Sequence, residues 1–149
     1  MRVRYETLKR IPIVLAGLAL ALSVVQVGQA SGVVFFRTPS GNLGCVYAAA
    51  QPGLQASLRC DIRSGLKPKP ARPRKCDLDY GDSYELPKVG RTIVVCHGDT
   101  ALDPHAPVLA YGRTWQHNGL RCTSKTVGLR CTNRAGHGFF MSRAHSYRF

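Results

Sequence analysis

The sequence LRCTSKTVGLRCTNRAGHGFFMSR, residues 120–143, decides the fold. Two copies of Leu-Arg-Cys stand on either side of a short turn. Because side chains alternate between the two faces of a β-strand, each Leu and Cys share one face and the Arg between them takes the other. A hairpin that closes over residues 125–128 would bring Cys122 opposite Cys131, at a distance that a disulfide can span. The stretch therefore predicts a disulfide-bonded β-hairpin.

The same pattern recurs upstream as Leu58-Arg59-Cys60 and, more loosely, as Leu43-Gly44-Cys45, which hints at a duplicated hairpin. Turn residues separate short alternating or β-rich segments, and no sustained 3.6-residue period occurs after residue 30. We expect an all-β fold, a small disulfide-stapled antiparallel sandwich or partly open barrel built from short hairpins. The segments expected to form strands are residues 33–38, 43–47, 58–62, 91–96, 108–115, 120–132 and the strand around Phe139. Residues 76–85 are expected to form an acidic turn, and residues 142–149 to dock on the sheet.

The first thirty residues have the pattern of a secretory signal peptide. A basic start precedes an apolar run, and small residues follow at Gly28-Gln29-Ala30. Four of the 21 Lys and Arg and one of the eight Asp and Glu fall in this segment, which leaves 17 and 7, a net charge of +10. We therefore expect a signal peptide at residues 1–30 and a single secreted or periplasmic β domain at residues 31–149. No transmembrane segment is expected to remain after the signal is removed.

All six cysteines follow the predicted signal peptide, which favours an oxidised framework in an extracytoplasmic protein. Six cysteines allow 15 pairings, and the sequence alone does not choose among them. We favour sequential pairing, because the outer pairs then join Leu-x-Cys motifs. Each bridge would add about 2–4 kcal/mol of stability. The favoured bridges are Cys45–Cys60, Cys76–Cys96 and Cys122–Cys131.

Residues 63–75 combine six cations with three prolines and contain no acid, which predicts an extended, solvated loop. Such a loop could contact an anionic envelope polymer or another secreted protein. An ordinary solvated loop accounts for the same residues equally well. The loop lacks the aromatic residues of a single-strand stacking platform, so no specific nucleic-acid recognition is expected. We expect a monomer. The candidate binding residues are Lys67, Lys69, Arg72, Arg74 and Lys75.

His137 lies between two glycines after the hairpin, where an imidazole could bind a ligand or transfer a proton. His97 and Asp99 could supply a base and the carboxylate that orients it. A turn histidine that satisfies backbone groups is the more ordinary interpretation, and we assign no catalytic residue. The cysteine and histidine spacings do not fit a zinc site, and residues 77–88 do not fit a calcium loop. We expect no metal and no cofactor.

Several fragments together resemble a family of small exported bacterial proteins that is catalogued only as a domain of unknown function. The resemblance covers about residues 34–149 and implies export and a cysteine framework, with no assigned activity. The fragments that carry it are Phe36-Arg-Thr-Pro-Ser-Gly-Asn-Leu-Gly-Cys45, Leu58-Arg-Cys-Asp-Ile62, Gly98-Asp-Thr100, Tyr111-Gly112, Gly128-Leu-Arg-Cys-Thr-Asn133, Gly136-His-Gly-Phe139 and Ser142-Arg143.

These observations leave three functional hypotheses open. The first is a non-enzymatic binding or structural module of the cell envelope that contacts anionic polymers through the basic loop. The second is a small secreted hydrolase or nuclease that uses His137 with His97 and Asp99. The third is an inhibitor of a secreted hydrolase, with residues 134–138 or 68–73 as the segment that plugs the enzyme.

Overall fold

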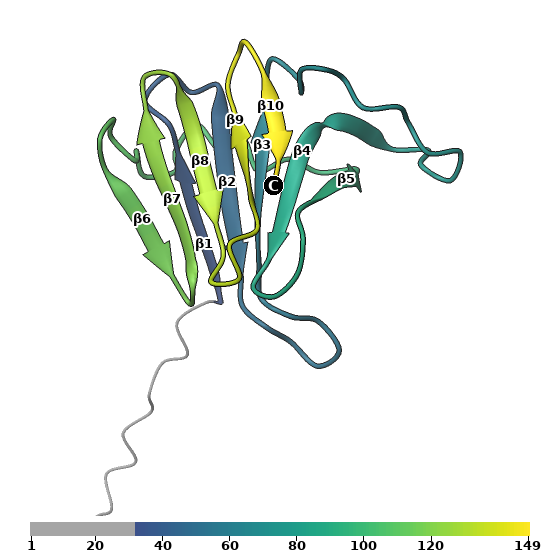
Figure 1. Cartoon of the computed structure of the whole chain (residues 1–149), viewed down its shortest axis with the longest axis horizontal. Helices are drawn as coiled ribbons and strands as arrows, with labels where there is room; N and C mark the ends of the chain where they lie inside the picture. The colour runs from purple at the N-terminus through teal and green to yellow at the C-terminus, as the bar shows by residue number, and fades with distance from the viewer. Residues whose placement is uncertain (1–31) are drawn as a thin grey trace, which may run out of the picture.

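The computed structural model describes residues 32–149, which form ten β-strands and their connections. The predicted signal peptide, residues 1–30, lies outside the described residues. Two antiparallel sheets of five strands pack face to face and do not close into a barrel (Figure 1). The all-β prediction is thus confirmed. Of the two architectures that we considered, the structure is the sandwich and not the partly open barrel. Within residues 32–149, no helix is long and apolar enough to cross a membrane.

Each sheet is a simple meander, because its strands lie in chain order. The first sheet contains β1 (Val33–Arg37), β2 (Leu43–Ala48), β3 (Ser57–Ile62), β4 (Asp79–Pro87) and β5 (Ile93–His97). The second contains β6 (Thr114–His117), β7 (Leu120–Lys125), β8 (Gly128–Thr132), β9 (Gly138–Met141) and β10 (Ser146–Arg148).

The two sheets carry matching rows of inward-facing residues, each with two cysteines between two aromatic residues. Directly paired residues on neighbouring strands point to the same face of a sheet, so each row forms a continuous strip. In the first sheet the row is Phe36, Cys45, Cys60 and Tyr84. In the second sheet it is Trp115, Cys122, Cys131 and Phe139.

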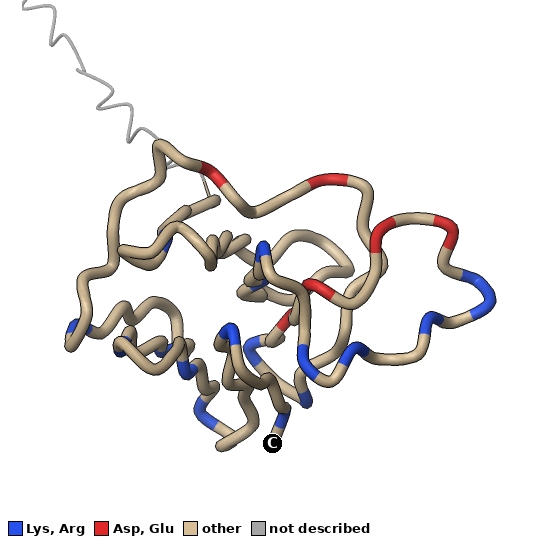
Figure 2. The backbone as a smooth tube through the Cα atoms, turned by 90° about the horizontal axis from the view of Figure 1, so that it is seen from above, with Lys and Arg blue, Asp and Glu red and all other residues tan. Residues whose placement is uncertain are grey.

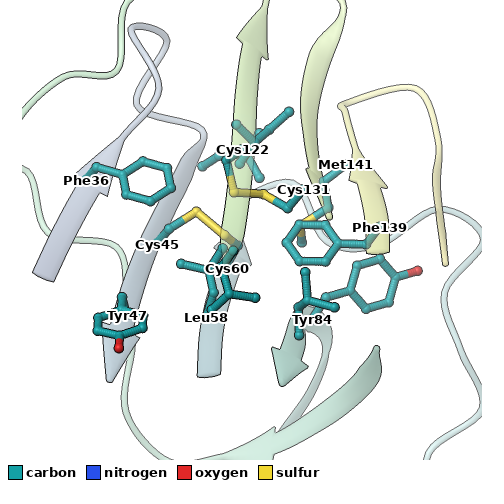
Figure 3. Close-up of a cluster of buried hydrophobic side chains, with 14 of the residues drawn as sticks. Phe36, Cys45, Tyr47, Leu58, Cys60, Tyr84, Cys122, Cys131, Phe139 and Met141 are labelled. Carbon is teal, nitrogen blue, oxygen red and sulfur yellow. A yellow bond between two sulfur atoms is a disulfide. The ribbon is translucent and has the colours of Figure 1, made fainter. Parts of the chain in front are cut away.

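The rows face each other across the core. The ring of Phe36 stacks on Trp115 at 5.0 Å between centroids, and the ring of Tyr84 lies 5.6 Å from Phe139. The two row disulfides lie between these aromatic pairs, in one buried cluster (Figure 3). Leucines from the Leu-x-Cys motifs, such as Leu58, fill the rest of the cluster. The repeated sequence motif is thus the sequence signature of this doubled core.

The structure has three disulfides and no free cysteine among the described residues. Two of them cross-link directly opposed residues of adjacent strands, and the third joins the segment before β4 to the end of β5. This is the sequential pairing. The bridges are Cys45–Cys60, Cys76–Cys96 and Cys122–Cys131.

Two of the expected elements were wrong. The expected acidic turn at residues 76–85 gives way at Asp79 to β4, the longest strand, whose Tyr84 and Leu86 are buried in the core. The expected strand at residues 108–115 is interrupted by a turn in which the N–H of Arg113 donates to the carbonyl of Ala110 (3.1 Å). β6 therefore begins only at Thr114.

The connection from β5 to β6 crosses the outer face of the first sheet, and we call residues 98–109 the strap. The strap reaches β1, where the N–H of Arg37 donates to the carbonyl of Pro107 (3.0 Å). It passes so close to β2 that a Cβ on Gly44 would overlap the carbonyl oxygen of Ala101. The strap therefore covers the outer face of the first sheet, whereas no corresponding segment covers the second among the described residues.

Candidate functional site

A buried carboxylate holds the strap to the first sheet. Asp61 is 2% exposed and points outward from β3. Its carboxylate accepts from Arg59 Nε (2.9 Å) and Nη2 (2.8 Å), and from the hydroxyls of Ser83 (2.6 Å) and Thr100 (3.2 Å). The backbone N–H of Ala101 completes the set at 2.7 Å. Five donors on two oxygens leave this carboxylate saturated, which suits a structural anchor better than a catalytic group.

The electrostatics of this anchor match its geometry. Burial alone would raise the pKa of Asp61, but the hydrogen bonds from Arg59, Ser83 and Ala101 outweigh it and hold the pKa below its usual value. Arg59 also donates from Nη1 to the carboxylate of Asp99 (2.6 Å), which lowers the pKa of that exposed acid. The Asp99 side chain of the hydrolase hypothesis is therefore engaged by an arginine.

His97 lies at the edge of the same network, with an acceptor at each ring nitrogen. Nε2 lies 2.9 Å from the carboxylate of Asp82, and Nδ1 lies 2.6 Å from the carbonyl of Asp99. Burial alone would lower the pKa of His97, but these two hydrogen bonds outweigh it and raise the pKa. Two acceptors fit a doubly protonated imidazolium, which has no free nitrogen to act as a base.

His137 lies at the other end of the sandwich from His97. The backbone N–H of His137 donates to Asn133 Oδ1 (3.1 Å), and Asn133 donates to the carbonyl of Pro87 (3.1 Å), the last residue of β4. His97 instead pairs with Asp79, the first residue of β4. The nine residues of β4 put about 25 Å between the two places. The arrangement of His137 with His97 and Asp99 is therefore not formed.

Within residues 32–149, no group of three His, Cys, Asp or Glu side chains is placed to hold a metal ion. The inhibitor hypothesis stays a prediction, because no geometry of residues 134–138 or 68–73 distinguishes it.

The basic loop is tied down at both ends and exposed along its length. The N–H of Lys67 donates to the hydroxyl of Ser146 on β10 (3.1 Å), so the loop begins beside the second sheet. The guanidinium of Arg72 donates to the carbonyls of Cys76 (3.2 Å) and Leu78, and is partly used within the loop. All five candidate cations are exposed, and in residues 32–149 none forms an ion pair with an acid.

The strongest charge asymmetry lies in the second half of the chain. Residues 104–149 contain no Asp or Glu, and all seven acids after residue 30 precede them. No red segment lies beside the C-terminus in Figure 2, whereas several blue ones do. The second sheet therefore carries positive charge without acids, whereas all seven of these acids lie on the first sheet and its connections. The seven cations of residues 104–149, of which four lie on strands of the second sheet, are Arg113, Arg121, Lys125, Arg130, Arg134, Arg143 and Arg148.

Strand alternation places three of these cations on the outer face of the second sheet. Arg121 and Lys125 are exposed on β7, and Arg130 is exposed on β8, while the leucines and cysteines beside them are buried. We call this face, with Arg121, Lys125 and Arg130, the cationic face. Because strands hold these residues, their backbone positions and the face that they occupy are set by the sheet.

Aromatic rings stand among the cations on this face. Phe140 lies beside Arg130 in the sheet register and pairs with Tyr147 on its other side. Its ring stacks with Tyr147 at 5.3 Å and with His145 at 5.1 Å. The guanidinium of Arg130 lies 3.9 Å from the ring centroid of Phe149. Tyr147 is 45% exposed, so ring surface remains accessible to a ligand. The cations can attract an anionic polymer, and the exposed rings beside them can stack on planar groups that the polymer carries.

The comparison with protein families gives one match. A family described as "Family of unknown function (DUF6636)" matches residues 14–149. The chain belongs to this family. No curated protein and no solved structure matches the chain. Membership confirms the resemblance to a family of unknown function. The family has no assigned activity that could be transferred to this chain. The three disulfides fit a protein that resides outside the cytoplasm.

Sequence reasoning missed the cationic face, although its signal was present. The absence of acids after Asp103 is visible in the sequence, and Leu-Arg-Cys alternation already puts Arg121 and Arg130 on the outer side. The aromatic contribution of Phe140 and Tyr147 was not accessible in the same way, because it depends on the pairing of β9 with β10.

Proposed function

We propose that this chain is a non-enzymatic binding module of the cell envelope that holds anionic polymers. The observation that carries the proposal is the acid-free second sheet, whose cationic face presents three exposed cations beside half-exposed rings. The basic loop extends this surface, because Lys67 is hydrogen-bonded to Ser146 on the edge strand β10. A ligand could thus contact the face and the loop together.

A polyanion that replaces its counterions with protein cations binds with a steep salt dependence. Each phosphate-like contact contributes about 0.7–0.9 to the slope of log affinity against log salt concentration. Three cations on the face should therefore contribute about 2 to 3 to that slope. Stacking on the rings would add affinity that salt does not remove for a polymer with planar groups. Dextran sulfate has none, so its retention should depend on charge and be lost at high salt.

The test is retention on immobilised dextran sulfate in a salt gradient, with uncharged dextran as the blank resin. The face variant replaces Arg121, Lys125 and Arg130 by Gln. The loop variant replaces Lys67, Lys69 and Lys75 by Gln, so that both variants lose three charges. We expect both to elute at lower salt than the wild type, and the face variant to elute first because its three charges project from one face of a sheet.

A matched single substitution separates local contact from net charge. Lys125→Gln removes a charge on the cationic face, and Lys88→Gln removes the same charge next to β4, where its amine donates to Asn118 (2.9 Å). Lys125→Gln should lower the eluting salt concentration more than Lys88→Gln. Equal shifts would mean that only the overall charge matters, and salt-independent retention would mean that the polymer is not held by charge. Either result would contradict the proposal.

A further inference from the structure

The matching core rows end differently at the two edges of the sandwich. At the edge formed by β1 and β6, the stack of Phe36 on Trp115 closes the row. At the opposite edge, the next residue along the first row is Val94 on β5, and the next along the second row is Arg148 on β10. A guanidinium therefore stands on the second sheet where the first sheet has a valine, and the core ends there in a polar, open edge.

A cleft of about 470 Å³ lies at this open edge. Its volume is in the range of small-molecule sites, which are about 300–1,000 Å³. Both sheets and the start of the basic loop contribute to its walls, and no lining residue is acidic. The apolar and aromatic part of the lining consists of Pro68, Pro70, Tyr84, Val94, Tyr147 and Phe149.

The polar part of the lining supplies hydrogen-bond donors and positive charge. Arg148 donates from Nη1 to the carbonyl of Thr92 (3.2 Å), which fixes its guanidinium at the cleft, 5.9 Å from the ring centroid of Tyr84. Arg91 brings a second guanidinium. Burial raises the pKa of Tyr84, so its hydroxyl stays protonated at neutral pH and can donate.

Thr92 adds an unpartnered buried hydroxyl. The residue is 4% exposed, and its Oγ1 has no hydrogen-bond partner in the described part of the chain. A buried hydroxyl without a partner costs about 1–3 kcal/mol, so proteins seldom keep one without a use. Here the hydroxyl belongs to a residue that lines a cationic cleft, and its oxygen is covered in the unliganded protein. An anionic ligand that shifts the covering side chains as it enters the cleft can accept from it.

We propose that the cleft at the edge of β5 and β10 is a binding site for a phosphomonoester carried by a flat apolar body. Two guanidinium groups and two hydroxyls offer enough donors for the three terminal oxygens of a phosphate. Tyr147, Phe149 and the prolines give the attached ring an apolar surface. Tyr84 and Arg148 of the cleft belong to the inner rows, whereas Arg121, Lys125 and Arg130 lie on the cationic face, so this proposal does not rest on polymer binding. Tyr147 and Phe149 are shared, because they line the cleft and also stand beside the cationic face.

The test titrates phenyl phosphate into the full mature protein and follows backbone ¹H–¹⁵N shifts and heat of binding. Inorganic phosphate and benzoate serve as probes that each lack one part of the ligand. We expect phenyl phosphate to bind at least tenfold more tightly than either, with the largest shifts at Thr92 and Arg148. Comparable affinities for phenyl phosphate and benzoate, or shifts confined to other regions, would overturn the proposal.

Variants distinguish a binding role from a structural one. Thr92→Val keeps the shape of the side chain and removes only the hydroxyl. We expect it to bind phenyl phosphate at least fivefold more weakly while its midpoint of urea unfolding stays unchanged or rises, because the lost hydroxyl had no partner. Arg148→Gln should also weaken binding, whereas Lys88→Gln, which removes one charge elsewhere, should not.

If Thr92→Val bound phenyl phosphate as tightly as the wild type, the proposed site would be wrong. This test stands even if Arg148→Gln fails to fold. Retention of Thr92→Val on dextran sulfate should equal that of the wild type, so failure of this proposal and failure of the polymer proposal are separate results.

Discussion

Replacing Asp61 by Asn should destabilise the protein through one buried group. The carboxylate accepts five hydrogen bonds, two of them from Arg59. An amide in its place turns one acceptor oxygen into an NH₂ donor. If the remaining oxygen keeps the N–H of Ala101, the NH₂ faces the hydroxyl of Ser83 and Nε of Arg59. The hydroxyl can turn to accept, but the guanidinium N–H cannot. Arg59, whose side chain is only 14% exposed, then loses the charge of the buried Asp61 and keeps only the exposed carboxylate of Asp99.

Breaking a buried ion pair by removing one partner costs about 3–5 kcal/mol. Typical domains have an unfolding free energy of about 5–15 kcal/mol, so the loss is a large share of the total. We expect urea unfolding of Asp61→Asn at pH 7 to give a free energy lower by this amount. The amide of Ala101 should also exchange with solvent faster, because a less stable fold opens more often.

Asp103→Asn is the matched control, since it makes the same chemical change in the strap. Asp103 is partly exposed, and its carboxylate accepts from the N–H of His105 (2.8 Å), a bond that an Asn oxygen can also make. Its substitution should change the unfolding free energy by no more than about 0.5 kcal/mol. A loss below 1 kcal/mol for Asp61→Asn, or one equal to the control, would refute the reasoning.

The pH dependence gives a second check on Asp61. Its pKa is lowered in the folded protein, so its contribution is present above the unfolded pKa of about 3.9 and is lost as the pH falls through the lower folded value. The difference in unfolding free energy between the wild type and Asp61→Asn should therefore hold from pH 7 to about 5 and shrink below pH 4. A difference that shrinks near neutral pH would point to another group.

Three further predictions concern stability. The raised pKa of His97 means that its stabilisation is complete below about pH 6.5 and fades as the pH rises through the higher folded value; the wild-type advantage over His97→Gln in urea unfolding should shrink in that direction. Replacing Cys122 and Cys131 together by Ala removes a cross-link over 9 residues and should lower the unfolding free energy by about 2–4 kcal/mol; no change would contradict its role in the core. Gly44→Ala should cost about 1–3 kcal/mol and speed proteolysis within the strap, because its Cβ would overlap the carbonyl of Ala101; unchanged proteolysis would count against the close approach.

The core of the fold could be predicted because alternation and cysteine spacing report the same geometry. Leu-Arg-Cys fixes which face Cys122 and Cys131 share, and the short turn between them fixes the register. The strand β4 could not be found this way. Its acids and Gly81 resemble a turn, and only the paired neighbours β3 and β5 make that segment extended.

The candidate sites could not be predicted, because they depend on contacts between residues that are far apart in the sequence. A single sequence gives no direct signal for such contacts. His97 and Asp99 resemble a base and its orienting carboxylate because they are close in the sequence, but the carboxylate of Asp99 accepts from Arg59 on β3 instead. The cleft required the edges β5 and β10 to meet, which places Thr92 beside Arg148 across 56 residues of chain. The positive charge of residues 104–149, by contrast, could be predicted from their composition alone.

The doubled row of aromatic and cysteine residues makes this chain the covalent equivalent of a dimer. In a true two-fold dimer every surface occurs twice, so a change on one outer face is copied to the other. Joining the halves removes that constraint. One half can bury Asp61 beneath a strap and keep the acids, while the other leaves Arg121 and Arg130 bare toward solvent. The linkage thus allows a single small core to present one side covered by the strap and one side with exposed cations.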